Sequence, residues 1–289
     1  MEFAVAAGRT GRSSSCFLIS KTLLILNLVL FVHFALYAQR DLTRIYGPED
    51  QTVPMPTFGG TLGQKDTAAL QELIDYVKAV NITAWRGLQA SGTLTDGSGS
   101  TSQATLTILN GDQFRLDVET PTGQRSTRIS GSYGKTLEVD GKSFPIPPAT
   151  AKAGLFAFPR LLVSNFPNSN TSFIDRGQIS VDGKLLHRIT VEESAFPAEV
   201  VLDQQGINVT DLYFDPTTHL LLKSAAAVQL DTADRQRYLI VVTYGDYQKV
   251  QDSLVPLVYS QTLNGQPQWT LHLNSPNLQP AVETSYFQF

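Results

Sequence analysis

The clearest pattern of hydrophobic and polar positions lies in residues 91–139. There, Leu106 and Ile108 alternate with threonines, and Gln113–Thr120 alternates apolar with charged residues. Successive side chains of a strand point to opposite faces, so each segment has one apolar and one polar face. The pair Asn110-Gly111 joins two such segments and is a strong hairpin signal, because both residues tolerate positive φ. The pattern predicts an antiparallel meander with one apolar face.

The parity of the third segment of this meander is unambiguous. Phe114, Leu116 and Val118 fall on one face, and the charged residues, among them Asp117, fall on the other. The apolar face has to be covered, whereas the charged face can meet water. We therefore expect Leu116 to be buried and a substitution of Asp117 to be mild.

A helix is predicted just before the meander, over residues 66–80. Its apolar residues follow the 3.6-residue period at i, i+3, i+4 and i+7, at Leu70, Leu73, Ile74 and Val77. Asp66 stands where a helix N-cap is expected. The apolar stripe of this helix needs a partner, and the sheet that follows provides one.

A second apolar segment, Thr150–Phe166, interrupts the strands. It follows a proline-rich break at Phe144–Pro148, and Gly154 and Pro159 prevent one long helix. We interpret it as one or two short helical turns that cover the apolar face of the sheet as a movable lid. The alternative is that this segment is ordinary core.

Strands resume from Gln178 and continue almost to the end of the chain. Turn signals of the type Asp-Gly or Asn-Gly recur, at Asp182-Gly183 and Asn264-Gly265. Together with the meander they predict about ten or eleven strands in one domain.

The start of the chain has the pattern of an export signal. Residues 1–38 contain basic residues, an apolar run at Leu23–Leu36 and a small residue at Ala38. We divide the chain into a signal peptide at 1–38, a flexible linker at 39–65 and a domain at 66–289. The alternative for the apolar run is an uncleaved anchor helix.

Composition and charge narrow the class of function. The formal net charge is −4, which argues against a nucleic-acid partner. The single cysteine, Cys16, lies in the predicted signal, so the exported domain has no disulfide and relies on its core.

No catalytic or metal-binding constellation is visible in the sequence. The histidines after the signal, His187, His219 and His272, lie in separate strand segments without ligand spacing. We interpret His219 as a surface residue after a turn. The chain is therefore expected to be a binding protein without cofactor or metal, and an unrecognised hydrolase is the weakest of the readings.

Several motifs together resemble a known family. They are Gly92–Thr95, Gly111–Leu116, Thr120-Pro121, Tyr213–Leu220, Tyr244–Val250 and Gln266–Asn274. In this order, after an export signal and an amphipathic helix, they resemble the LolA-like superfamily of periplasmic lipoprotein carriers and lipoprotein-sorting relatives. In carriers of this type an arginine that holds the lid stands four residues before the phenylalanine of the second strand, where this chain has Asn110.

The resemblance implies an α+β, mainly β fold. The expected sheet is strongly curved and antiparallel, an incomplete barrel with an N-terminal helix and a short helical lid. It also implies a periplasmic monomer that holds lipid or lipoprotein acyl chains in an apolar cavity, with an envelope protein as donor or acceptor. The expected ligand-binding residues are Leu106, Ile108, Phe114, Leu116, Val118, Phe156, Phe158, Leu161 and Leu162. The alternative is a non-catalytic interaction or regulatory module of the same fold with a collapsed cavity.

The export signal makes a direct prediction. The mature protein should begin near Gln39 and be recovered from the periplasm, because the apolar run is shorter than the roughly 20 residues of a membrane span. N-terminal sequencing of exported material measures this. An intact Met1 terminus in the membrane fraction would instead show an uncleaved anchor.

Overall fold

The structure, a computed structural model, describes residues 53–59, 62–82, 85–131, 133–155, 166–194, 207–228 and 236–288. Within these residues the fold is mainly β, with one antiparallel sheet of thirteen strands. The export-signal prediction falls on residues 1–38, which lie outside the described residues.

The helices are α1 (Thr67–Val80) and α2 (Pro148–Leu155), and a short 3-10 helix is η6 (Thr284–Phe287). The strands are β1 (Gly87–Asp96), β2 (Thr101–Leu109), β3 (Gln113–Thr120), β4 (Gly123–Ser130), β5 (Tyr133–Leu137), β6 (Ser143–Ile146), β7 (Thr171–Val181), β8 (Lys184–Ser194), β9 (Ile207–Phe214), β10 (Leu221–Val228), β11 (Tyr238–Val250), β12 (Ser253–Leu263) and β13 (Gln266–Asn277).

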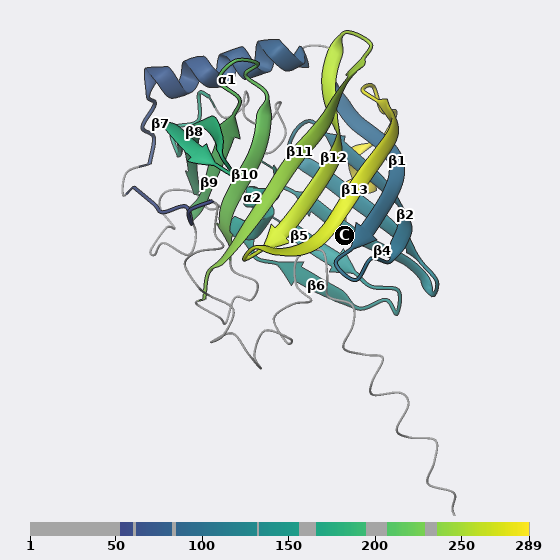
Figure 1. The fold of residues 1–289 in the computed structure, drawn as a ribbon. Coiled ribbons are helices and arrows are strands. Elements are labelled where there is room, and N and C mark those ends of the chain that lie inside the picture. Colours follow the sequence, from purple (N-terminus) through teal and green to yellow (C-terminus); the bar gives the residue numbers. More distant parts are fainter. Residues whose placement is uncertain are drawn as a thin grey trace, which may run out of the picture.

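Each strand pairs with the next one along the chain, except that β6 does not pair with β7. Instead, the first and the last strand of the chain, β1 and β13, pair with each other. The strand order is therefore β6-β5-β4-β3-β2-β1-β13-β12-β11-β10-β9-β8-β7, with β6 and β7 at the two edges. The sheet is curved, so that β11–β13 pass in front of the β1–β5 strands in Figure 1. We call the side inside this curve, which carries Leu106 and Leu116, the inner face, and the opposite side the outer face.

Tight turns set the register of several hairpins. Asp182-Gly183 and Asn264-Gly265 are two-residue turns, whereas Asn110-Gly111 lies in a three-residue loop with Asp112. All three pairs have positive φ at both residues. This conformation matches the right-handed twist of paired strands, and Asn, Asp and Gly adopt it at low cost. The predicted positions of these turns are confirmed. Register shifts in β1, β7, β10 and β12 then bend the strands and add to the curvature.

The sequence underestimated the number of strands. Phe144–Pro148 was predicted as a break, but Ser143–Ile146 forms the edge strand β6, where Pro145 is tolerated because an edge strand has one unpaired side. β7 begins at Thr171, well before Gln178. Its first four residues are all buried, so the alternation that reveals a half-exposed strand is missing there.

Helix α1 lies across one end of the sheet (Figure 1). Its buried face is rotated from the predicted stripe. This face is formed by Ala69, Glu72, Leu73, Tyr76 and Val80. Ile74 is 37% exposed, so that part of the prediction was wrong. The predicted cap also differs: Asp66 is at the N-cap position, but its carboxylate accepts hydrogen bonds from Asp175 N and Gln64 Nε2 instead of from the helix.

Helix α2 lies between the two walls of the curved sheet. It contacts β9 and β10 on one side and β5 on the other, and Ala151 is fully buried there. Figure 1 shows this helix behind β10 and β11. The N-terminal part of the segment predicted as a lid is thus a helix against the inner face.

The outer face is also covered by the segments near the two ends of the described residues. Val53 is buried in an outer-face cluster with Tyr213 and Leu239, so residues of the segment predicted as a linker pack on the sheet. At the other end of the chain, η6 contacts β3 and β4. Both contacts bury outer-face residues that alternation alone assigns to solvent.

Asp117 illustrates this correction. It is 6% exposed, pairs with Arg115 at 2.8 Å and accepts a hydrogen bond from Tyr286 Oη at 3.3 Å. Arg115 Nη1 in turn donates to the backbone oxygen of Tyr286. The expectation that Asp117 can be replaced without consequence was therefore wrong, because its removal leaves a largely buried guanidinium without its ion pair.

The inner-face parity predicts the effect of a charge on each side of β3. Leu116→Asp places an unpaired charge in the interior and should lower the free energy of unfolding by more than about 4 kcal/mol. Glu119→Leu, on the exposed outer face of the same strand, should change it by less than about 0.5 kcal/mol. Urea unfolding of both variants measures the difference, and equal midpoints would contradict the assigned faces.

Candidate functional site

The predicted residues of β2 and β3 meet on the inner face. Leu106 lies opposite Leu116 and Ile108 opposite Phe114 in the β2–β3 register. Leu106, Ile108, Leu116 and Val118 are 2–4% exposed and belong to one apolar cluster, against which the partly buried Phe114 packs. The structure therefore brings this half of the predicted site together.

The other predicted residues, Phe156, Phe158, Leu161 and Leu162, lie outside the described residues. The chain on both sides of them reaches the interior. Ala151 of α2 belongs to the same apolar cluster, and the ring of Phe166 packs edge-on against Phe173 of β7 at 5.6 Å. A role for the four residues as a lid stays a prediction.

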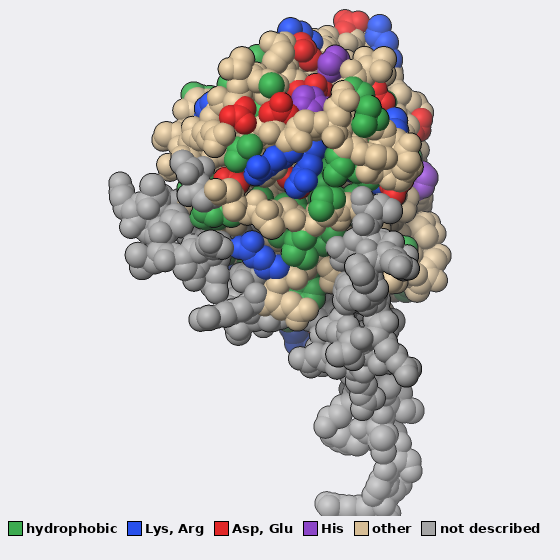
Figure 2. All heavy atoms as spheres, turned by 60° about the vertical axis from the view of Figure 1, so that its left-hand side comes forward, with side chains coloured by type: hydrophobic (Ala, Val, Ile, Leu, Met, Phe, Trp, Pro, Cys, Tyr) green, Lys and Arg blue, Asp and Glu red, His purple; other side chains and the backbone are tan. Residues whose placement is uncertain are grey.

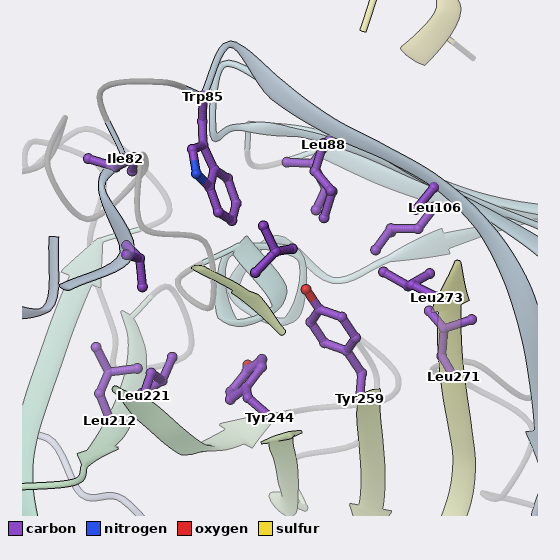
Figure 3. Packing of buried hydrophobic residues seen from close by; sticks show 14 of the residues in the cluster. Ile82, Trp85, Leu88, Leu106, Leu212, Leu221, Tyr244, Tyr259, Leu271 and Leu273 are labelled. Atoms are coloured by element: carbon purple, nitrogen blue, oxygen red, sulfur yellow. The ribbon is translucent and has the colours of Figure 1, made fainter. Parts of the chain in front are cut away.

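The opposite wall of the interior was not predicted from the sequence. It contributes Leu212, Tyr244, Tyr259, Leu271 and Leu273, which point toward Leu88 and Leu106 across the curve (Figure 3). Pairing of β1 with β13 places the two walls face to face, and no local pattern signals a pairing between the two ends of a domain. Residues 238–242 of β11 are all apolar, so alternation did not show which of its faces is the inner one.

Tyrosine side chains gather where α1 meets this wall. The ring of Tyr244 packs edge-on against that of Tyr259 at 5.6 Å, and its hydroxyl is 2.8 Å from Ser224 Oγ. Tyr247 Oη donates to the backbone oxygen of Leu221 at 2.7 Å. Burial raises the pKa of both Tyr244 and Tyr247, so their hydroxyls stay neutral. They add hydrogen-bonding groups to an otherwise apolar interior.

A carboxylate–histidine cluster holds α1 to the sheet. Glu72 of α1 is 7% exposed, and its two carboxylate oxygens lie 2.9 Å from His187 Nδ1 and 3.0 Å from His219 Nδ1. The other ring nitrogen of His187, Nε2, lies 2.8 Å from Asp175 Oδ1. Figure 2 shows histidine side chains beside acidic ones on this face of the molecule. His219 is thus a partner of α1 and not the isolated surface residue that the sequence suggested.

The geometry of His187 favours its charged form. Both of its ring nitrogens lie within hydrogen-bond distance of a carboxylate oxygen, and a protonated ring donates from both nitrogens at once. Burial lowers the pKa of His187, but the hydrogen bonds with Asp175 and Glu72 outweigh this effect and the pKa is raised above 6.5. For Asp175, burial raises the pKa, but the bonds from Gly177 N and His187 lower it overall. We call Glu72, Asp175, His187 and His219 the helix latch.

The described residues offer neither a metal site nor a membrane-spanning helix. They contain no cluster of three or more metal-ligating side chains of His, Cys, Asp or Glu that could hold an ion. Nor does the described part of the chain include a helix long and apolar enough to cross a membrane.

Comparison with known proteins reports likenesses of fold. No family model matches the chain, and no curated protein matches it. It is similar to a solved structure of a LolA superfamily protein from Nitrosomonas europaea, with 10% identity, a TM-score of 0.46 and coverage of 76% of this chain and 97% of that one. A Vibrio parahaemolyticus domain assigned as an outer membrane lipoprotein-sorting protein has the same score and coverage at 15% identity.

A DUF1329 family protein from Desulfovibrio piger is similar to the same degree, with 11% identity and a TM-score of 0.46 over 76% of this chain and 97% of that chain. These likenesses concern the fold alone.

The helix latch predicts a pH dependence. Since the pKa of His187 is raised in the folded state, its contribution is complete below about pH 6.5 and is lost as the pH rises through the folded-state value. The lowered pKa of Asp175 makes its contribution complete above about pH 4 and lost at lower pH. Hydrogen exchange of 67–80, corrected for intrinsic rates, should be slower at about pH 5.5 than at about pH 8.5.

His187→Gln should remove most of this pH dependence, and the melting temperature at about pH 5.5 should fall by a few degrees. His272→Gln, at an exposed position of β13, is the matched control and should behave as the wild type. The latch assignment is wrong if exchange of α1 in the wild type does not change between the two pH values.

Proposed function

We propose that the chain is a periplasmic binding protein that holds acyl chains or another lipid, including those of lipoproteins, inside its curved sheet. Donor and acceptor would be proteins of the envelope, and the protein would act without catalysis or cofactor. The observation that carries the proposal is the interior itself: two apolar walls, from β1–β3 and β11–β13, face each other, and α2 fills the interior between β5 and β9–β10.

The way in which the interior is bounded supports a carrier. In the described residues the edge strands β6 and β7 pair with β5 and β8 and not with each other. On this side α2 covers the inner face, and its buried side chains include the small residues Ala151 and Ala153. Displacing such a helix breaks no hydrogen bond between strands, so a ligand could enter without unfolding the sheet.

The physical chemistry of acyl chains fits this interior. Each CH₂ group moved from water into an apolar site contributes ~0.8 kcal/mol. A single fatty chain against the leucines of both walls would therefore bind without a charged partner.

One observation favours the alternative, an interaction or regulatory module with a collapsed cavity. Leu106, Leu116, Leu271 and Leu273 are each at most 3% exposed and share one packed cluster. Such packing is what a filled core requires. In this case any partner would bind to the outside of the molecule.

A substitution that only adds volume separates the two readings. Leu106→Phe should weaken uptake of a fluorescent fatty acid about tenfold or more if the interior opens for a ligand, with little change in melting temperature. In a filled core the added atoms cost about 1–3 kcal/mol, so the melting temperature falls instead. Leu185→Phe, at a position of β8 that is 52% exposed, is the control for ring size.

Native mass spectrometry of the protein from its own envelope, before and after organic extraction, supplies the independent readout. We expect a bound lipid that extraction removes. A wild type that carries no lipid and takes up no probe would rule out the carrier and leave the interaction module.

A further inference from the structure

An arginine lies on the inner face of the sheet. Arg125 of β4 is opposite Val118 of β3, which is opposite Ala104 of β2. Val118 and Ala104 are both 3% exposed members of the interior cluster. The three residues therefore form one row on the inner face, and Arg125 itself is only 7% exposed.

The guanidinium of Arg125 has one unsatisfied nitrogen. Its Nε is buried and has no hydrogen-bond partner among the described residues. Burial lowers the pKa of Arg125, while the charges of Glu138 and Asp96 raise it through space. Oε1 of Glu138 is likewise buried without a hydrogen-bond partner there.

Other arginines of the sheet are differently placed. Arg115 Nε is 2.8 Å from Asp117 Oδ2, Arg188 Nη2 is 2.6 Å from Asp211 Oδ2, and Arg128 Nη1 donates to the backbone oxygen of Gln288 at 2.6 Å. A buried guanidinium without such a partner is costly, so a site that keeps one needs a reason. An anionic ligand that arrives from outside the chain provides it.

The surroundings of Arg125 suggest an amphiphile and not a free ion. Thr127 and Thr136 extend the inner face onto β4 and β5, with their hydroxyls 3.3 Å apart, in the row that contains Leu106 and Leu116. The inner face is thus apolar on β2 and β3 and carries polar side chains on β4 and β5 at Arg125, Thr127 and Thr136, beside the apolar Ile129. A ligand with an acyl chain and a polar head matches this division.

We propose that Arg125 binds the anionic head group, a carboxylate or a phosphate, of the lipid whose chain lies against β2 and β3. The planar fork of a guanidinium matches both anions with two parallel hydrogen bonds. Glu138 balances part of the positive charge of Arg125 while the site is empty. Its negative charge also reduces the free energy gained when the anion binds. This inference rests on the proposed lipid-binding function.

Ligands that share a chain and differ in the head test the site. Dodecanoate and dodecyl phosphate should bind the wild type at least about tenfold more tightly than dodecanol, because a hydrogen bond to a charged group is lost with the alcohol. Arg125→Gln should reduce this preference to about one while the affinity for dodecanol stays within about twofold. Competition with a fluorescent fatty alcohol, at concentrations below aggregation, gives the affinities.

Arg128→Gln is the matched control, because Arg128 lies on the outer face of the same strand. It should keep the preference of the wild type. Arg125→Lys, which keeps the charge without the fork, should retain only part of it. If Arg125→Gln does not fold, the preference of the wild type alone still decides, because equal binding of dodecanoate and dodecanol contradicts the proposal.

The outcomes also separate this inference from the proposed function. Equal affinities for all three ligands, unchanged in Arg125→Gln, would retain the lipid-binding protein and reject the head-group site. Absence of binding for every ligand would reject both. Displacement of dodecyl phosphate by an equal concentration of inorganic phosphate would assign Arg125 to a free anion and overturn the proposal of an amphiphile.

Discussion

The antiparallel pairing of β1 with β13 determines what every other element can do. It joins the strands that come first and last along the chain, with Leu94 opposite Leu271 in the ladder. Without this ladder, β1–β6 and β7–β13 would be two separate meanders, each with an apolar face exposed to water. With it, the two faces enclose one interior, which α1 and α2 then complete. Each proposed property, from lipid binding to recognition of a head group, depends on this enclosure.

Charged groups sit at the boundaries of that interior and each has a different consequence. The ion pair of Arg115 and Asp117 ties the C-terminal segment to the outer face of β3, and the helix latch on Glu72 ties α1 to one end of the sheet. Both have their hydrogen bonds satisfied within the chain and therefore act as structure. Arg125 differs, because its buried Nε has no hydrogen-bond partner among the described residues. In this fold, buried charged groups with satisfied hydrogen bonds attach one segment to another, whereas a buried charged group with an unsatisfied one is available to bind a ligand.

Local features of the sequence were enough to predict the hairpins and the inner parity of β2 and β3. Asn110-Gly111 defines its turn by backbone conformation, and Leu116 belongs to an alternating strand, so both could be read from neighbouring residues. Ser143–Ile146 and Asp117 were misjudged because their environment is set by distant parts of the chain, a sheet edge and the segment around Tyr286. Glu72 reads as one more polar residue of a helix until His187 and His219 are placed beside it. The same holds for the candidate site. The wall formed by β2 and β3 could be predicted from the sequence, whereas the facing wall and the position of Arg125 follow only from the register of the strands.

The same pairing of the two ends has a consequence for the time course of folding. Hairpins between neighbouring strands can form as soon as both strands are available, but β1 must wait for β13, which is made last. Contacts of such large sequence separation slow folding and leave an unpaired strand edge beside an apolar face in the meantime. The period between the appearance of β1 and the arrival of β13 is therefore when this chain is most exposed to aggregation and most dependent on a chaperone.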